Sequence, residues 1–185
     1  MGDARVVVLV PIKRFDAGKS RLRASLSDAQ TVTLARELAR GVIEACAPLE
    51  CRVVCDDDEV ARFALECGST PLRVSAADLN GSISEAYRSI TSSLDVVVIA
   101  HGDIARPTGL GQLSPGEGVT IFTDRHGTGT NVMALPAAIQ FNFAYGTHSA
   151  RRHEAEARRR GLAVRVVTNS PWGHDIDVPE DLEDP

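Results

Sequence analysis

Residues 5–11 (RVVVLVP) form an almost continuously apolar run that leads directly into a polar loop, IKRFDAGKSRL, at residues 12–22. An apolar run of this length is typical of a central strand that is covered on both faces. Residues 94–100 (LDVVVIA) repeat the pattern further along the chain. Together the two runs predict the centre of a largely parallel sheet that is buried between layers of helices.

Helical and strand-like segments alternate around these two runs, as is typical of βαβ units. Ser27 begins a helix that we expect to reach about residue 47, because apolar residues recur there at helical spacing. Other helices are expected at residues 57–67, 82–93 and 149–160, and other strands at 51–55, 71–75, 119–123, 132–135 and 163–168. The sequence therefore predicts an α/β fold, a Rossmann-like three-layer α/β/α sandwich with a mixed, mostly parallel sheet, in a single domain over residues 1–185.

Composition narrows the class of protein. The 185 residues are 43% hydrophobic and 24% charged with a formal net charge of −5, which fits a soluble globular domain and not a basic nucleic-acid coat. Aromatic residues make up 4% and do not interleave with the arginine run at 151–160, so we expect no nucleic-acid partner. No apolar run approaches the ~20 residues of a membrane span, so we expect no membrane partner.

Cysteine usage points to a reducing compartment. The four cysteines lie between residues 46 and 67 without a CxxC pair, and no histidine completes a metal-ligand set among them. We expect buried free thiols and a cytoplasmic location.

Only two of the 20 basic residues are lysines, and both follow the first strand. Lys13 and Lys19 share that loop with Arg14 and Arg21, a cluster of cations that suits a polyphosphate. The loop lacks the glycines of a P-loop, and no GxGxxG fingerprint occurs in the chain. A solvated basic loop is the alternative interpretation.

Carboxylates occur at two further points where chemistry is expected. Asp103 follows the second apolar run in His-Gly-Asp and could hold Mg²⁺, or could merely cap a turn. Asp175 and Asp177 point to one side if their segment is extended, which would let one of them share a cation with Asp103. The alternative for this pair is an acidic tail.

Two glycine-containing loops are candidate anion sites. Residues 123–131 (TDRHGTGTN) combine glycines with hydroxyl and amide donors, although a plain turn would also use glycine. Residues 145–153 (YGTHSARRH) open a helix, where Ser149 as N-cap and free backbone N–H groups would seat an anion and Gly146 would allow close approach.

Five motifs, in order along the chain, carry a resemblance to a known family. PIKRFDAGKSRL (11–22), DLNGSISEAYR (78–88), DRHGTGTN (124–131), YGTHSARRH (145–153) and DIDVPEDL (175–182) resemble the 2-phospho-L-lactate/phosphoenolpyruvate guanylyltransferases. That family has the nucleotide-diphospho-sugar transferase fold and acts in deazaflavin coenzyme biosynthesis. The resemblance implies a Mg²⁺-dependent transfer of GMP from GTP to the phosphate of a small phosphorylated acid, with release of pyrophosphate.

The resemblance also implies roles for individual residues. Asp103 and Asp175 would hold Mg²⁺, with Asp177 close by, and the acid would be bound by Thr130, Gly146 and Ser149. Lys13, Lys19 and Arg21 would face the triphosphate, and Asn80 would lie near the guanine. Lys13, Lys19 and Asp103 are the expected catalytic residues.

Some features depart from the family pattern or leave alternatives open. Asp103 is followed by Ile104-Ala105 where relatives continue with Leu-Pro or Ile-Pro, and residues 108–118 are too short and glycine-rich for the helix usually found there. Phosphoenolpyruvate is the expected acceptor, since the arginine-rich composition looks actinobacterial, with 2-phospho-L-lactate and 3-phosphoglycerate as the other acids that the resemblance leaves open. The alternatives are another nucleotidyltransferase of this fold, of the molybdopterin or sugar-phosphate type, and a non-catalytic nucleotide-binding protein. The oligomeric state is not predicted.

Overall fold

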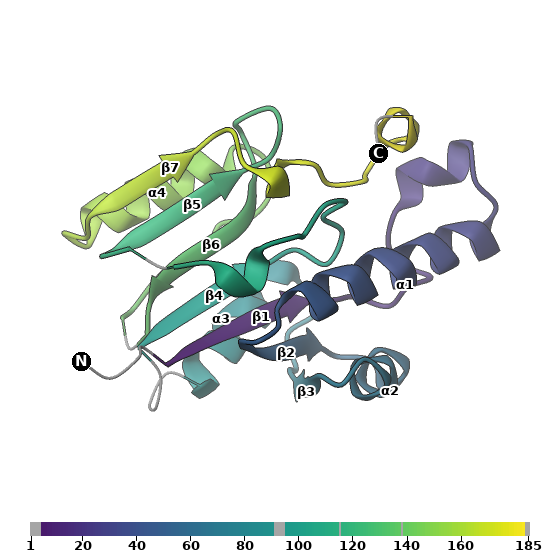
Figure 1. Cartoon of the computed structure of the whole chain (residues 1–185), viewed down its shortest axis with the longest axis horizontal. Helices are drawn as coiled ribbons and strands as arrows, with labels where there is room; N and C mark the ends of the chain where they lie inside the picture. Colours follow the sequence, from purple (N-terminus) through teal and green to yellow (C-terminus); the bar gives the residue numbers. More distant parts are fainter. Residues whose placement is uncertain (1–4, 91–94, 115, 138, 184–185) are drawn as a thin grey trace.

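A seven-stranded sheet forms the centre of the molecule (Figure 1). The computed structural model describes residues 5–90, 95–114, 116–137 and 139–183. The strands occur in the order β3-β2-β1-β4-β6-β5-β7. Their bounds are β1 Val6–Pro11, β2 Glu50–Cys55, β3 Thr70–Arg73, β4 Val96–Ala100, β5 Val119–Thr123, β6 Thr130–Pro136 and β7 Val164–Val167.

Strand directions confirm the mixed, mostly parallel sheet. β1 runs parallel to β2 and β4, β2 to β3, and β5 to β7, whereas β6 is antiparallel to both β4 and β5. The chain builds β1, β2 and β3 toward one edge and then returns to place β4 on the other side of β1. This reversal is a topological switch point, where loops that leave the carboxyl ends of neighbouring strands separate and open a crevice.

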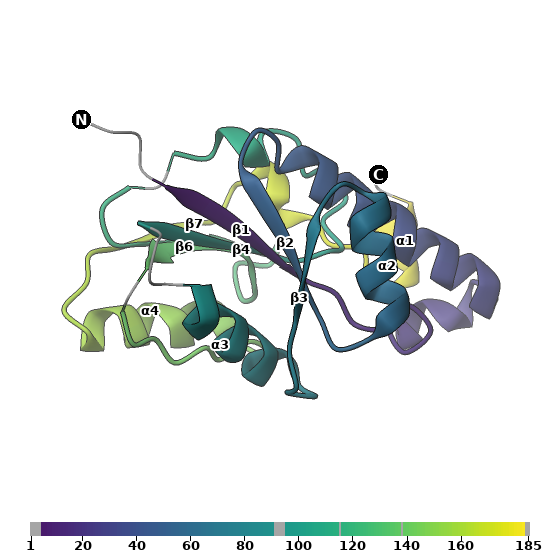
Figure 2. The same ribbon diagram turned by 90° about the horizontal axis from the view of Figure 1, so that it is seen from below.

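Helices cover both faces of the sheet, as the apolar runs predict. α1 (Asp28–Ala45) and α2 (Asp58–Glu66) lie on one face, and α3 (Leu79–Ile90) and α4 (Ser149–Arg159) lie on the other (Figure 2). Alternate residues of each strand supply the two cores: Val8 and Val10 pack toward α1 and α2, whereas Val7 and Leu9 pack toward α3. β1 is thus buried on both sides, which explains its continuous apolar sequence.

Most predicted boundaries are confirmed to within a few residues. Ser27 caps α1 in a capping box with Gln30, whose amide oxygen accepts the Ser27 N–H at 2.9 Å. The third helix begins at Leu79 and not at Ser82, because the Asp78 carboxylate accepts the Gly81 N–H at 3.0 Å and supports an earlier first turn. The expected end of that helix at residue 93 and the first residue of the 94–100 strand lie outside the described residues.

The cysteines and residues 108–118 test two further predictions from the sequence. All four thiols are free, and Cys46 and Cys55 are buried, whereas Cys51 and Cys67 are only half-buried. Residues 108–114 and 116–118 contain a single 3₁₀ turn, η3 (Leu110–Gln112), in agreement with the expected lack of a helix there. Within the described ranges, no helix is both long enough and apolar enough to cross a bilayer.

Turn η3 fixes the loop that follows β4 against the end of α1. A Cβ added at Gly111 would lie 1.9 Å from the Ala47 carbonyl oxygen, so this close approach of two backbones requires glycine. The loop that begins with Asp103 is therefore held against the end of α1 at η3.

Substituting Gly111→Ala should destabilise the fold, because the added methyl group must displace backbone. We expect the free energy of unfolding in urea, followed by circular dichroism, to fall by about 1–3 kcal/mol. Gly116→Ala is the matched control, because nothing lies within 4 Å of a Cβ added at that position. Equal effects of the two substitutions would contradict the packing assigned to Gly111.

Candidate functional site

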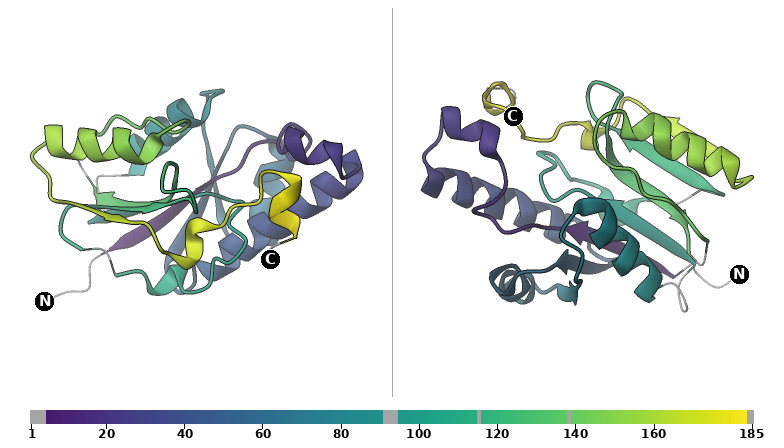
Figure 3. Two further views of the ribbon diagram at one scale, coloured as in Figure 1. Left: turned by 90° about the horizontal axis from the view of Figure 1, so that it is seen from above. Right: turned by 180° about the vertical axis from the view of Figure 1, so that it is seen from behind.

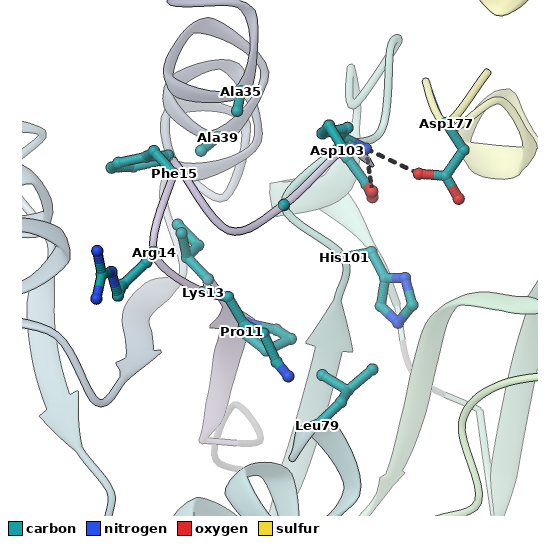
Figure 4. Close-up of a pocket in the computed structure, with 14 residues that line it drawn as sticks. Pro11, Lys13, Arg14, Phe15, Ala35, Ala39, Leu79, His101, Asp103 and Asp177 are labelled. Atoms are coloured by element: carbon teal, nitrogen blue, oxygen red, sulfur yellow. Dashed lines mark hydrogen bonds and ion pairs between the residues drawn. The ribbon is translucent and has the colours of Figure 1, made fainter. Parts of the chain in front are cut away.

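A pocket opens at the switch point between β1 and β4 (Figure 4). The loop after β1 supplies Lys13, Phe15 and Lys19, and the loop after β4 supplies His101 and Asp103. Ala35 and Ala39 of α1, Leu79 at the start of α3 and Asp177 from the C-terminal segment also line it. The crevice predicted from the strand order is therefore lined by residues of the lysine-bearing loop and of both carboxylate segments that the sequence singles out.

Lys19 is the centre of the charged part of this pocket. Its Nζ lies 2.5 Å from Asp103 Oδ2 and 3.0 Å from Asp177 Oδ1, and its side chain is only 9% exposed. Burial acts to lower the Lys19 pKa, but attraction to the two carboxylates outweighs this and holds the pKa above its usual value. Lys19 has a left-handed backbone (φ 57°), an unusual conformation for a residue with a side chain.

The C-terminal segment reaches the site because it pairs with the loop after β4. Ile104 and Asp175 form an isolated antiparallel bridge, and the Ile176 N–H donates to the Asp103 carbonyl at 3.2 Å. This pairing places DIDVPEDL beside His-Gly-Asp, although 71 residues separate Ile104 from Asp175. Figure 3 shows the same segment (yellow) next to the loop that follows β1 (purple).

Asp175 lies beside the other two carboxylates and is tied to the sheet. Its Oδ1 accepts a hydrogen bond from Asn131 Nδ2 at 3.1 Å. Burial raises the Asp175 pKa, and repulsion from Asp103 and Asp177 adds to the rise. Asp103 Oδ1 is buried and has no hydrogen-bond partner in the described part of the chain. The structure thus joins Asp103 and Asp177 through Lys19 and places Asp175 near enough to be repelled by both, but among the described residues no three such side chains are grouped to hold a metal ion.

The remaining predicted cations differ in what they contact. Lys13 is exposed at the pocket wall, where its Nζ donates to the Ala77 carbonyl at 3.2 Å. Arg14 pairs with Asp16 at 2.6 Å. Arg21 is exposed on the 3₁₀ turn η1 (Ser20–Ala24) and is not part of the pocket wall.

Asn80 holds another segment in place. Its Oδ1 accepts the Tyr145 N–H at 2.7 Å, and its Nδ2 donates to the Tyr145 carbonyl at 3.3 Å. Each end of the amide makes one hydrogen bond, and the expected place of Asn80 near the guanine stays a prediction. In the structure, the side chain ties α3 to the loop before α4.

Thr130 and Ser149 lie inside the protein, in a polar cluster with His153. His153 Nε2 accepts the Ala144 N–H at 2.9 Å, so its Nδ1 carries the hydrogen and donates to Thr130 Oγ1 at 3.0 Å. Ser149 Oγ donates to the same hydroxyl at 3.3 Å, and both residues are 2% exposed. The prediction that Ser149 caps α4 is wrong: His148 (φ 57°) holds the cap position, and the Ser149 N–H donates to the Gly146 carbonyl.

The two expected anion loops use several of their backbone donors internally. Asp124 accepts the Thr128 N–H at 2.8 Å, and its carbonyl accepts the Gly127 N–H, so the β5–β6 loop folds around this residue. The Ala150 N–H at the start of α4 is taken by the Thr128 carbonyl. Gly146 has a φ of 110°, and a Cβ added there would meet nothing within 4 Å, so close approach of a ligand remains available.

Sequence reasoning missed two residues of the site. His101 lines the pocket, its ring 5.1 Å from that of Tyr145, and His101 Nε2 is buried without a hydrogen-bond partner among the described residues. His153 orders Thr130 from 23 residues away. The position of His101 between a buried strand and Asp103 was the available signal, whereas nothing in the spacing of His153 indicates its partner.

Comparison with known proteins decides the family. The family described as "Guanylyl transferase CofC like" matches residues 6–184 of the chain. The chain belongs to this family. It is 31% identical to a phosphoenolpyruvate guanylyltransferase of Sphaerobacter thermophilus, over 96% of this chain and 91% of the relative. It is 29% identical to a 2-phospho-L-lactate guanylyltransferase of Methanothermobacter thermautotrophicus, over 96% and 82% respectively.

Solved structures confirm the fold of this guanylyltransferase family member. A Desulfovibrio desulfuricans G20 protein assigned to the nucleotide-diphospho-sugar transferases matches with a TM-score of 0.77 at 17% identity, covering 97% of this chain and 85% of that one. A nucleotidyl transferase from Methanothermobacter matches with a TM-score of 0.65 at 16% identity, covering 98% and 95%. The chain is a nucleotidyltransferase by family, and its fold is the one that the sequence motifs predict.

The buried cluster around His153 makes stability depend on pH. Burial lowers the His153 pKa from 6.5 to about 4, and repulsion from His101 and Arg152 adds to the effect. As the pH falls below about 6.5, the unfolded chain takes up a proton that the folded protein refuses until about pH 4. Stability is therefore lost over this interval, by about 3 kcal/mol from this residue.

We expect His153→Gln to be less stable than the unsubstituted protein at pH 7 but to lose less stability between pH 7 and pH 4, measured by urea unfolding at each pH. His126→Gln, at an exposed histidine of the β5–β6 loop, is the control and should keep the original slope. If His153→Gln also keeps that slope, His153 is not the group responsible.

Proposed function

We propose that this protein transfers GMP from GTP to the phosphate of phosphoenolpyruvate and releases pyrophosphate. The observation that carries the proposal is the buried Lys19 ammonium between Asp103 and Asp177, in a crevice at the carboxyl ends of β1 and β4 that Lys13 also lines. Such a crevice is where open α/β sheets bind nucleotides. Membership of the guanylyl transferase family supports guanine as the base.

The reaction needs little proton transfer from the protein. An oxygen of the acceptor phosphate attacks the α-phosphorus of GTP, and a new P–O bond forms. The bond from the α-phosphorus to the bridging β-oxygen breaks, and pyrophosphate leaves with that electron pair. The acceptor phosphate is already ionised at pH 7, so positioning and charge neutralisation supply most of the catalysis.

We assign the neutralisation to the two lysines. Lys19, held at a fixed place by two carboxylates, would meet the phosphate oxygens without reorganising, and exposed Lys13 would extend to the triphosphate from the opposite wall. Arg21 would add a cation from the neighbouring turn η1. Asn80 would act near the guanine indirectly, by holding Tyr145 and the start of α3.

The carboxylate set fits a hard divalent cation such as Mg²⁺. Asp103 Oδ1 is buried without a hydrogen-bond partner within the described residues, and a buried carboxylate oxygen left in this way suits a cation. Asp103, Asp175 and Asp177 would hold the ion after a rearrangement, because no three such side chains in the described part of the chain are grouped to hold a metal ion as they stand. Bound there, Mg²⁺ would neutralise charge on the phosphates.

The acceptor is proposed from the relatives and from the loop before α4. Relatives from Sphaerobacter and Chloroflexus are named phosphoenolpyruvate guanylyltransferases, and those from two methanogens are named for 2-phospho-L-lactate. The acid would approach at Gly146, where space is open, over the buried pair of Thr130 and Ser149. A cytoplasmic role in deazaflavin coenzyme biosynthesis is part of the proposal, and the four free thiols are consistent with a reducing compartment.

Pyrophosphate release tests the reaction and the acceptor together. We expect release from GTP and Mg²⁺ with phosphoenolpyruvate, less or none with 2-phospho-L-lactate or 3-phospho-D-glycerate, and none with ATP or CTP. Chelation of Mg²⁺ should abolish it. Failure of every acid with folded protein that binds GTP would reject the proposed reaction and favour a nucleotide-binding role.

Asp103→Asn should separate catalysis from folding. The substitution keeps the shape of the side chain and removes the charge that faces Lys19, so kcat/KM should fall by about 10²-fold or more. Asp95→Asn is the control: Asp95 lies at the other end of β4, in an exposed pair with Arg5, and should leave activity unchanged. Full activity of Asp103→Asn would remove this residue from the proposed site.

A further inference from the structure

Arg125 and Asp181 belong to two motifs, DRHGTGTN and DIDVPEDL, but neither has a role in the site so far. Arg125 lies in the β5–β6 loop, and Asp181 lies in the 3₁₀ turn η5 (Pro179–Leu182). Arg125 Nη2 forms an ion pair with Asp181 Oδ1, which joins segments 56 residues apart. The Asp181 side chain is 3% exposed, so this contact is buried on the carboxylate side.

The other oxygen of Asp181 fixes the backbone of Asp177. Asp181 Oδ2 accepts the Asp177 N–H at 2.7 Å and the Val178 N–H at 2.9 Å. Burial acts to raise the Asp181 pKa, but these two N–H groups and Arg125 outweigh it and hold the pKa below its usual value. Asp181 is therefore a charged acceptor whose Oδ2 is held by two backbone N–H groups, while its Oδ1, which accepts no hydrogen bond within the described residues, is paired with Arg125 by charge.

Asp177 in turn reaches the centre of the site. Its Oδ1 accepts from Lys19 Nζ at 3.0 Å, while its side chain is 51% exposed. A carboxylate on an irregular segment stays within reach of its partner only where the backbone that carries it is held in place. The backbone immediately before it is tied by the Ile176 N–H to Asp103, and the hydrogen bonds to Asp181 tie residues 177 and 178.

We infer that Arg125 and Asp181 are positioning residues, which form a brace that holds Asp177 against Lys19. The brace connects the β5–β6 loop to the cluster of Lys19, Asp103 and Asp177. A buried carboxylate that lost its arginine would be left with an uncompensated charge, so each half of the brace depends on the other. That the brace supports catalysis rests on the proposed function. The mechanical claim, that the brace holds the backbone of Asp177 in place, does not.

Amide hydrogen exchange, resolved by NMR, tests the mechanical claim. In Asp181→Asn we expect the amides of Asp177 and Val178 to exchange about tenfold faster, the size of effect that loss of a capping carboxylate produces. Arg125→Met should accelerate the same two amides, and Arg125→Lys, which keeps the charge, should accelerate them less. The Ile176 amide, which donates to Asp103, is the internal control and should keep its rate.

Kinetics test whether the positioning matters to the reaction. We expect Asp181→Asn and Arg125→Met each to lower kcat about tenfold with KM for GTP changed by less than about threefold. The double variant should be less impaired than the product of the two single effects, because both act on one brace. Arg158→Met, which breaks an exposed ion pair with Glu154 on α4, is the matched control and should change neither exchange nor kcat.

Each outcome has a distinct meaning. Unchanged exchange at residues 177 and 178 in both single variants would overturn the brace. Faster exchange at Ile176 together with residues 177 and 178 would also overturn it, because the substitutions would then have loosened the whole segment. Faster exchange at residues 177 and 178 alone, with kcat unchanged, would overturn the positioning role in catalysis. If the unsubstituted protein transfers no nucleotide, the proposed function fails, and the exchange rates alone still decide whether Arg125 and Asp181 hold Asp177.

Discussion

The site depends on one electrostatic constraint, an ammonium group that is almost removed from water. Lys19 can be 9% exposed and still charged only because Asp103 and Asp177 face it. The carboxylates depend on Lys19 in turn, since it is the cation that lies between Asp103 and Asp177, while Asp175 beside them is repelled by both. These ion pairs thus hold together three segments that are remote in sequence. The loops after β1 and β4 cannot move apart without breaking the ion pair between Lys19 and Asp103.

The sheet makes this constraint possible and keeps it at one edge. β1 and β4 end at the same edge, and reversed β6 begins there, so Asn131 at its start can reach Asp175. Behind this edge, Thr130, Ser149 and His153 form a second polar layer that is closed to solvent. The outer layer carries charge, and the inner layer orders the loop around Gly146. The charged residues of the site and the buried polar residues that support them therefore lie one behind the other at the same ends of the strands.

Sequence patterns predicted the strands, the helices and the loops that make the site, because each depends on periodicity or on a local stop signal. They placed Lys19, Asp103 and Asp177 at the carboxyl ends of the strands, and in the structure Lys19 forms ion pairs with both carboxylates. What they could not give is the direction of individual side chains. Asn80 and Ser149 lie in the first turns of α3 and α4, and their side chains turn to the Tyr145 backbone and to Thr130. Spacing contains no information on such contacts, which are set by how α3 and α4 pack on the sheet.

The left-handed backbone of Lys19 has a consequence for what substitutions this position can tolerate. A residue with a Cβ costs about 1–2 kcal/mol in that conformation, and glycine would avoid the cost. Selection for a more stable chain would therefore favour glycine here, directly after Gly18, whereas selection for the buried charge retains lysine. At this residue, the backbone conformation favours glycine and the buried ion pairs require lysine. The protein therefore keeps a strained backbone at the position where it needs the ammonium group.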